Sequence, residues 1–158
     1  MIRINDEAIN LIKSFEGLFL DAYHGSKDRP GIDTIGYGTI KYPPTYLGGK
    51  MVKLGDPVIT EAQAFEFLKW EVEKMLPQID LLVRDDLTIN QFNALTSFCY
   101  NLGTGALKMS NLRKKINVTP NDSGIRAEFM KWTCSNGECG IKGLVRRRKA
   151  EADLYFKK

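Results

Sequence analysis

Apolar residues recur at helical spacing along most of the chain, and the first such segment begins close to the N-terminus. The spacing predicts an amphipathic helix over about residues 6–16. Asn5 precedes this segment as a helix cap, and Gly17 follows it as a stop. The predicted apolar face of the helix consists of Ala8, Leu11, Ile12 and Phe15.

The periodicity changes after this helix. The runs LFLDAY at 18–23 and DTIGYGTI at 33–40 are short, contain aromatic and β-branched residues, and flank a loop with glycine and proline. These features predict two strands joined by that loop. Prolines and glycines continue through KYPPTYLGGKMVKLGDPV, so we expect residues 18–58 to form a small lobe of strands and loops.

Helical spacing returns after this lobe and continues to the C-terminus. Two capping-box signatures mark helix starts, TEAQ with Thr60 and Gln63, and TINQ with Thr88 and Gln91. The apolar positions after the first signature are Ala64, Phe65, Leu68, Val72, Met75, Leu76 and Ile79. Those after the second are Phe92, Leu95, Phe98, Cys99 and Leu102, followed by the stop Gly103. Shorter helices are expected over about residues 110–117, 123–133 and 144–156.

The strand and helix patterns together predict an α+β fold in one domain over residues 1–158. The strand lobe covers about residues 18–58, and a helical lobe covers about residues 60–158 and includes the N-terminal helix. A chain of 158 residues can bury a hydrophobic core without the support of disulfides or metal ions. No apolar run approaches the roughly 18 residues of a membrane span, and the polar, acidic start MIRINDEAIN does not resemble a signal peptide.

Charge and cysteine content narrow the classes of function. The net charge of +4 suits a protein that approaches polyanions such as nucleic acid, anionic lipid or wall polymers, but is also ordinary for a soluble domain. One histidine, His24, and three scattered cysteines cannot supply a usual zinc ligand set, so we expect no metal. Cys99 lies on an apolar helix face and is expected to be a buried thiol. Cys134 and Cys139, in CSNGEC, could close a small loop through a disulfide or stay reduced.

The acid beside Gly17 is the first candidate for chemistry. Glu16 is expected in the last turn of the first helix, where the helix dipole disfavours a carboxylate, and Phe15 and Leu18 supply apolar neighbours. Both effects favour the protonated acid, which is the form that can donate a proton to a glycosidic oxygen. The alternative is a surface glutamate at a helix end with no part in chemistry.

The three acids that follow differ in their expected surroundings. Asp21 belongs to the first strand segment and is expected to be an exposed strand acid. Asp33 directly precedes Thr34, so on a strand their side chains face opposite sides. Asp28 lies in the loop GSKDRPG, where an ionised carboxylate could hold a water molecule or pair with a neighbouring lysine or arginine.

These residues resemble the signature of the phage-type lysozymes, the endolysins of tailed phages that form one glycoside hydrolase family. That signature is a glutamate, then an aspartate, then a threonine, followed by IGYG or a close variant. Here FEG at 15–17 is followed by DRPGIDTIGYG at 28–38, and five residues separate Asp28 from Thr34, as in the family. Eleven residues separate Glu16 from Asp28, more than in the usual pattern, which a short insertion near HGS at 24–26 accounts for.

The resemblance extends in order over nearly all of the chain. The segment 90–117, NQFNALTSFCYNLGTGALKMSNLRKKIN, is similar to the family's central helix and the turn after it. AEFMKW at 127–132 and GLVRRRKAEADLY at 143–155 are similar to its closing helices. The resemblance implies a lysozyme-like fold, in which a cleft lies between a small β or loop lobe and a larger, mostly α-helical lobe, and it implies no cofactor.

The resemblance also implies an activity, the hydrolysis of the β-1,4 bond between N-acetylmuramic acid and N-acetylglucosamine in bacterial peptidoglycan, which causes cell lysis. Glu16 would be the general acid, and Asp28 and Thr34 would hold a water on the far face of the sugar, which is an inverting design. Tyr100 and Asn101 match positions that line the saccharide groove in relatives, although CYNLG could also be a helix end that packs on the core.

The resemblance gives a role to one residue of a basic run. One of Arg146, Arg147 and Arg148 matches an arginine that pairs with the catalytic glutamate or supports its helix in relatives. At least two of the three are expected on a solvated helix face. Trp132 is expected to pack in the helical core rather than stack on sugar.

Two alternatives remain open at this point. A lytic transglycosylase would use the glutamate without a water and leave a 1,6-anhydro sugar, but the presence of both Asp28 and Thr34 favours hydrolysis. A non-catalytic module that binds cell wall or nucleic acid would use the basic run, but TINQFNALTSF is too apolar for a helix that contacts bases. We expect peptidoglycan as the partner, no nucleic acid, no membrane insertion and a monomer. From the family, we expect synthesis in the host cytoplasm without a signal peptide, and action on the cell wall after release.

Overall fold

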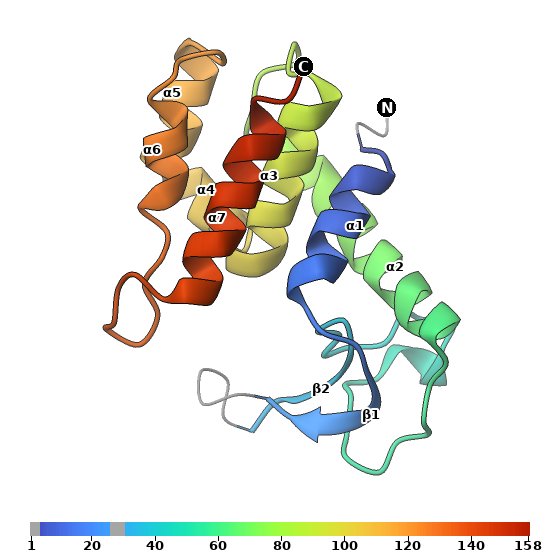
Figure 1. The fold of residues 1–158 in the computed structure, drawn as a ribbon. Helices are drawn as coiled ribbons and strands as arrows, with labels where there is room; N and C mark the ends of the chain where they lie inside the picture. The colour runs from blue at the N-terminus through green and yellow to red at the C-terminus, as the bar shows by residue number, and fades with distance from the viewer. Residues whose placement is uncertain (1–3, 26–30) are drawn as a thin grey trace. The chain divides into compact units, whose positions relative to one another are not determined.

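Helices account for most of the described chain, and one two-stranded sheet accompanies them (Figure 1). The computed structural model describes residues 4–25 and 31–158. The elements are α1 (Asp6–Phe15), β1 (Phe19–His24), β2 (Asp33–Gly36), the short 3-10 helix η1 (Leu47–Gly49), α2 (Glu61–Asp80), α3 (Ile89–Leu102), α4 (Thr104–Met109), α5 (Asn111–Val118), α6 (Ile125–Met130) and α7 (Lys142–Tyr155). The α+β class that the sequence predicts is confirmed.

The chain divides into two compact units. The strand unit is Glu16–Glu73 and contains β1, β2, η1 and the first part of α2. The helical unit is Met1–Phe15 together with Lys74–Lys158, and it contains α1, the end of α2 and the helices α3 to α7. Glu16 and Thr34 therefore belong to the strand unit, whereas Tyr100 and Asn101 belong to the helical unit.

The core of the helical unit surrounds α3. Every residue of this helix from 91 to 99 is buried, and α1, α4 and α7 all pack against it. The buried polar side chains of α3 have hydrogen-bond partners, as polar groups removed from water require. Asn93 Nδ2 donates to Asn5 Oδ1 at 2.5 Å, and Thr96 Oγ1 donates to the Phe92 carbonyl at 2.9 Å. Because Asn5 Oδ1 also accepts from the Glu7 amide, the predicted cap of α1 is confirmed and is tied to α3.

Both predicted capping boxes are present. Thr88 Oγ1 accepts from the Gln91 amide at 3.2 Å, and Gln91 Oε1 accepts from the Thr88 amide at 3.0 Å. Thr60 and Gln63 make the same reciprocal pair, with distances of 3.1 and 2.9 Å. Each box satisfies two amides that the first turn of a helix leaves without partners, so α2 and α3 begin where the sequence predicts.

The strand unit contains a short antiparallel hairpin. β1 and β2 pair Phe19 with Gly36, Tyr23 with Thr34 and His24 with Asp33, with an irregularity in β1 between the first two of these pairs. The second strand is shorter than the predicted 33–40 because the chain turns at Gly36. The amides and carbonyls of Ile35 and Thr39 bond to each other across this turn, at 2.9 Å in both directions.

The fully buried apolar residues of the strand unit come from β2, from the segment between β2 and α2, and from α2. They are Ile35, Tyr42, Ile59, Ala64, Leu68 and Val72. Three aromatic rings, of Tyr42, Tyr46 and Phe67, contact one another beside this core, with centroids 5.0 to 5.6 Å apart. α2 therefore gives the hairpin the apolar support that two strands alone lack.

The helices after α3 differ in number and length from those that the sequence predicts. α4, with six residues, was not predicted, because a helix of less than two turns shows no apolar periodicity. α6 is shorter than the predicted 123–133, and α5 and α7 agree within two residues at each end. Cys134 and Cys139 form a disulfide, which the sequence left open, and Cys99 is the buried thiol that it predicted.

Candidate active site

Glu16 lies at the junction of α1 and the strand unit. The helix ends at Phe15, so Glu16 is the first residue past it rather than part of its last turn, and its side chain is half-buried. Gly17 follows with a φ of +30°, and a Cβ there would lie 3.2 Å from the Phe19 ring. The glycine thus lets the chain leave α1 and enter β1 directly after Glu16.

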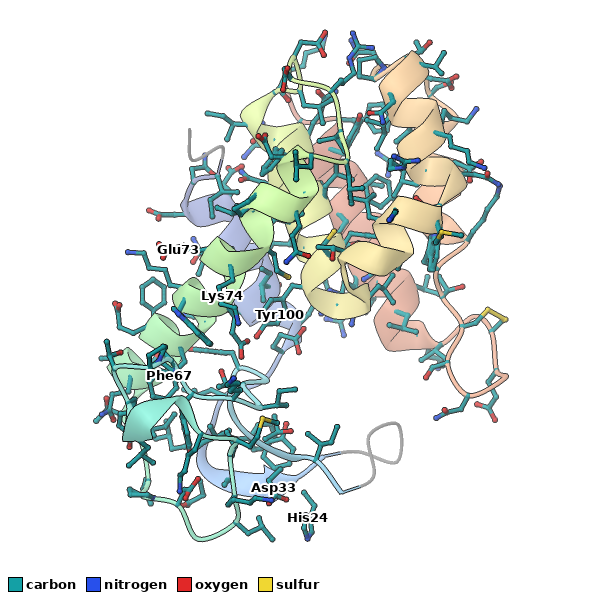
Figure 2. The ribbon with its side chains drawn as sticks, turned by 180° about the vertical axis from the view of Figure 1, so that it is seen from behind. His24, Asp33, Phe67, Glu73, Lys74 and Tyr100 are labelled. Carbon is teal, nitrogen blue, oxygen red and sulfur yellow. A yellow bond between two sulfur atoms is a disulfide. The ribbon has the colours of Figure 1, made fainter. Side chains whose placement is uncertain are left out.

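Thr34 and Asp33 lie next to each other on β2. Thr34 is buried and pairs with Tyr23 of β1. Asp33 and His24 lie beside each other (Figure 2), with Oδ1 of Asp33 2.6 Å from Nδ1 of His24. Oδ2 of Asp33 accepts a hydrogen bond from the Leu54 amide at 3.0 Å. The hydrogen bond from Leu54 holds the pKa of the Asp33 carboxyl below its usual value, and His24 adds to this effect. One Asp33 oxygen therefore links β2 to β1, and the other links the hairpin to the loop that contains Leu54.

The other two acids of this region have different positions in the structure. Asp28 lies outside the described residues. Among the described residues nearest to it, the Gly25 amide donates to the Ile32 carbonyl at 2.8 Å. Asp21 is exposed on β1, as predicted. The structure thus describes two of the three candidate catalytic residues, Glu16 and Thr34, and both belong to the strand unit.

The IGYG turn after Thr34 has a packing role. Gly36 has a φ of +66°, and a Cβ at this position would lie 3.3 Å from the Ala64 Cβ of α2. Only glycine satisfies both the backbone angle and the close approach to the helix. Tyr37 is buried next to it, and its hydroxyl reaches Glu61 Oε1 at 3.5 Å. The turn therefore fixes the end of β2 against α2.

Tyr100 and Asn101, the candidate saccharide-binding residues, lie in the last turn of α3 and are half-buried. Asn101 Oδ1 accepts a hydrogen bond from Arg148 Nη2 of α7 at 2.7 Å. Arg148 is fully buried, and its guanidinium carbon lies 5.1 Å from the centroid of the Phe98 ring. The end of α3 is thus held by a buried arginine.

The basic run of α7 corrects one prediction. At least two of its arginines were expected in solvent, but Arg147 and Arg148 are both buried, and both pair with the buried carboxylate of Glu151. Arg146 is exposed, and Arg146 and Arg147 both lie over the Phe15 ring, at 5.9 and 5.7 Å from its centroid. They therefore support the end of α1, at the residue directly before the candidate acid.

Sequence reasoning missed Glu151. A signal was present, because this glutamate follows Arg147 and Arg148 at the four- and three-residue spacings that bring side chains together on a helix. Burial raises the pKa of the Glu151 carboxyl, against the opposing effects of Arg148, Arg147 and Ser97. Burial also raises the pKa of the Cys99 thiol to about 12. Trp132 packs edge-on against Phe98 with centroids 5.4 Å apart, as predicted.

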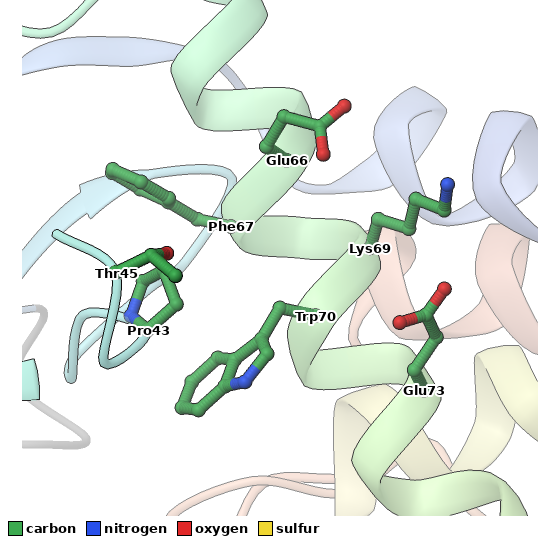
Figure 3. Close-up of a pocket in the computed structure, with 7 residues that line it drawn as sticks. All are labelled: Pro43, Thr45, Glu66, Phe67, Lys69, Trp70 and Glu73. Atoms are coloured by element: carbon green, nitrogen blue, oxygen red, sulfur yellow. The ribbon is translucent and has the colours of Figure 1, made fainter.

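The strand unit also carries a hollow of about 240 Å³, shown in Figure 3. It is lined by Pro43, Thr45, Glu66, Phe67, Lys69, Trp70 and Glu73. Neither Glu16 nor Thr34 lines it, so this hollow is separate from the candidate residues. Among residues 4–25 and 31–158, we find no group of three or more potential metal ligands and no helix with the length and apolar character of a membrane span.

Comparison with solved structures defines the class of fold. The endolysin from Escherichia coli O157:H7 phage FAHEc1 superposes with a TM-score of 0.82 at 36% sequence identity, covering 97% of this chain and 92% of that one. The fold is therefore lysozyme-like, as the sequence predicts.

Sequence comparison then identifies the family. The phage lysozyme family model matches residues 13–151, and the chain belongs to this family. The endolysin of Bacillus phage B103 is 38% identical over 155 residues, which are 98% of this chain and 54% of that protein. The endolysin of Acyrthosiphon pisum secondary endosymbiont phage 1 is 36% identical over 157 residues, which are 98% of each protein. The chain thus spans about half the length of the Bacillus phage relative and nearly all of the second.

Proposed function

We propose that the chain is a bacteriolytic enzyme that degrades peptidoglycan, and specifically a muramidase that hydrolyses the β-1,4 bond between N-acetylmuramic acid and N-acetylglucosamine. The observation that carries this proposal is the family match over residues 13–151, which includes Glu16, Asp28, Thr34 and the IGYG turn in the family's order. The names of the relatives support it, because both are endolysins. Under this proposal, the protein acts as a monomer on the cell wall and needs no cofactor.

Glu16 is the proposed general acid. It would give its proton to the glycosidic oxygen as the bond to the anomeric carbon breaks. Its half-buried position directly after the end of α1 supports this role, because the helix fixes the backbone from which the carboxyl projects.

Asp28 and Thr34 are the proposed water-holding pair. The water would attack the anomeric carbon from the opposite face of the sugar, Asp28 would accept its proton, and the Thr34 hydroxyl would orient its oxygen. One displacement by water inverts the configuration at the anomeric carbon. The burial of Thr34 on β2 supports this part of the proposal, because a fixed hydroxyl can orient a water without a further loss of side-chain freedom.

Tyr100 and Asn101 are the proposed saccharide-binding residues. An aromatic ring and an amide at the end of one helix provide an apolar surface and hydrogen-bonding groups, which are the two elements that a sugar ring with an N-acetyl substituent needs. The contact between Asn101 and Arg148 supports the proposal, since it holds the amide in one orientation.

Product analysis tests the reaction. Purified protein would be incubated with purified peptidoglycan, the soluble muropeptides identified by mass spectrometry, and the anomeric configuration of early products read by proton NMR. We expect reducing-end muramic acid products that are initially the α-anomer. Asp28→Asn should reduce the rate by at least about a hundredfold, whereas the matched control Asp21→Asn should leave it unchanged.

Two outcomes would contradict the proposal. Products that end in 1,6-anhydromuramic acid would identify a lytic transglycosylase and leave Asp28 and Thr34 without their proposed role. The absence of released products from the wild-type protein would contradict the enzyme activity on this substrate and favour a wall-binding module.

A further inference from the structure

A buried charged cluster joins α7 to α3 within the helical unit. Glu151 of α7 has no exposed surface, and its Oε1 accepts from Ser97 Oγ at 2.8 Å and from Arg147 Nε at 3.2 Å. Arg148 approaches the same carboxylate, with Nη2 at 3.2 Å from Oε1 and Nε at 2.9 Å from Oε2. The second of these contacts is an ion pair rather than a well-aligned hydrogen bond. Two buried cations thus share one buried carboxylate.

This sharing gives Glu151 a part in holding both arginines in their buried positions. A guanidinium taken out of water is costly unless a nearby anion compensates it, and two adjacent guanidinium groups repel each other. Glu151 lies within 3.2 Å of both Arg147 and Arg148. Loss of its charge would therefore remove an anion that lies beside both guanidinium groups and weaken the attraction that holds them in their buried positions.

Arg148 connects Glu151 to the end of α3. Its Nη2 donates to Glu151 Oε1 and also to Asn101 Oδ1, at 2.7 Å. A guanidinium is a donor only, so it selects the amide oxygen of Asn101 and turns the amide nitrogen away from itself. The amide is thereby set to present N–H donors, which match acceptors such as sugar hydroxyl and N-acetyl carbonyl oxygens.

We propose that Glu151 is a positioning residue for glycan binding, which holds Arg148 in place so that Arg148 holds the Asn101 amide with its N–H groups toward the saccharide. This inference rests on the proposed function, because it takes Asn101 as a residue that contacts the glycan. A Glu151 with a structural role alone would change the stability of the protein and leave the affinity of the folded protein unaltered.

A double-mutant cycle separates the two roles. Glu151→Gln keeps the shape of the side chain and removes its charge, and Asn101→Ala removes the amide. Apparent KM and kcat on purified peptidoglycan would be measured for wild type, both single variants and the double variant, at a temperature where circular dichroism shows all four folded. We expect each single variant to raise KM about tenfold with little change in kcat, and the double variant to raise it no further. An unchanged KM for Glu151→Gln, or additive effects in the double variant, would overturn the proposal.

A second measurement needs no catalysis. The side-chain amide of Asn101 gives a nitrogen–proton NMR signal, which is assigned by its loss in Asn101→Ala. In Glu151→Gln this signal should shift and its protons should exchange faster with water, whereas Ser97→Ala, which keeps both ion pairs, should change it less. An unchanged signal would overturn the proposal even if the wild type released no muropeptides, a result that by itself contradicts only the proposed function.

A further variant covers the case in which Glu151→Gln does not fold. Arg148→Lys keeps the positive charge beside Glu151 but lacks the forked group that reaches Glu151 and Asn101 together. It should raise KM and shift the same Asn101 signal. A folded Arg148→Lys protein with the wild-type KM and the wild-type signal would overturn the proposal.

Discussion

Leu95 provides the most direct test of where the core of the helical unit lies. It is fully buried at the middle of α3, while Leu81, just past the end of α2, is 88% exposed. Leu95→Ala removes three carbon groups from the core, worth about 2.4 kcal/mol at about 0.8 kcal/mol each. The cavity left behind adds roughly 1 to 2 kcal/mol, and the higher helix propensity of alanine offsets a few tenths. We therefore expect a loss of about 3 to 4 kcal/mol for Leu95→Ala and less than about 0.5 kcal/mol for Leu81→Ala.

Equilibrium unfolding in urea, followed by tryptophan fluorescence and by far-UV circular dichroism, measures this difference. With a denaturant slope of about 2 kcal/mol/M, the midpoint for Leu95→Ala should fall by about 1.5 to 2 M, and that for Leu81→Ala by less than about 0.3 M. The chemical change is the same at the two positions, so the difference in burial accounts for most of the expected difference in stability. Equal losses for the two variants, or a loss below about 1 kcal/mol for Leu95→Ala, would refute the assignment of α3 as the centre of the core.

Three further predictions follow from other parts of the structure. Because burial raises the pKa of the Cys99 thiol to about 12, this cysteine should resist iodoacetamide in the folded protein at neutral pH and react fully in denaturant, as read by intact mass. Thr88→Ala, which breaks the capping box of α3, should cost about 1 kcal/mol in urea unfolding, whereas Thr88→Ser should cost much less. The pKa of Asp33 is lowered by the Leu54 amide and by His24, so its carboxylate stabilises the folded state above its unfolded pKa and this contribution is lost as the pH falls through the folded value. Asp33→Asn should therefore be less stable than wild type at neutral pH, with a difference that shrinks as the pH falls from about 5 to about 2.

The elements that the sequence predicted well are those with local causes. α2 and α3 each begin at a reciprocal Thr–Gln cap and carry apolar residues at regular spacing, and both features can be read over a few neighbouring residues. β2 was predicted too long because its end depends on the contact of Gly36 with Ala64, which lies far away in the sequence. α4 was missed because six residues are too few to show a period.

In the candidate site, too, some residues could be predicted from local sequence and others could not. Glu16 and Thr34 could be named from the motif, and the exposed position of Asp21 from its strand pattern. The burial of Arg147 and Arg148 could not be predicted, because it depends on the face that α7 turns toward α3 and on the shared carboxylate of Glu151. Charged residues are mostly exposed, so local reasoning placed two of the three arginines in solvent.

The proposed general acid can be tested most directly by replacing Glu16 with glutamine, which keeps the size of the side chain and removes its proton donor. Rates of muropeptide release from purified peptidoglycan would be compared for wild type, Glu16→Gln and the exposed-acid control Asp21→Asn, with folding checked by circular dichroism. The role of Glu16 as general acid predicts a loss of about a thousandfold or more for Glu16→Gln and a wild-type rate for Asp21→Asn. A folded Glu16→Gln protein that releases muropeptides at a rate within tenfold of wild type would contradict it.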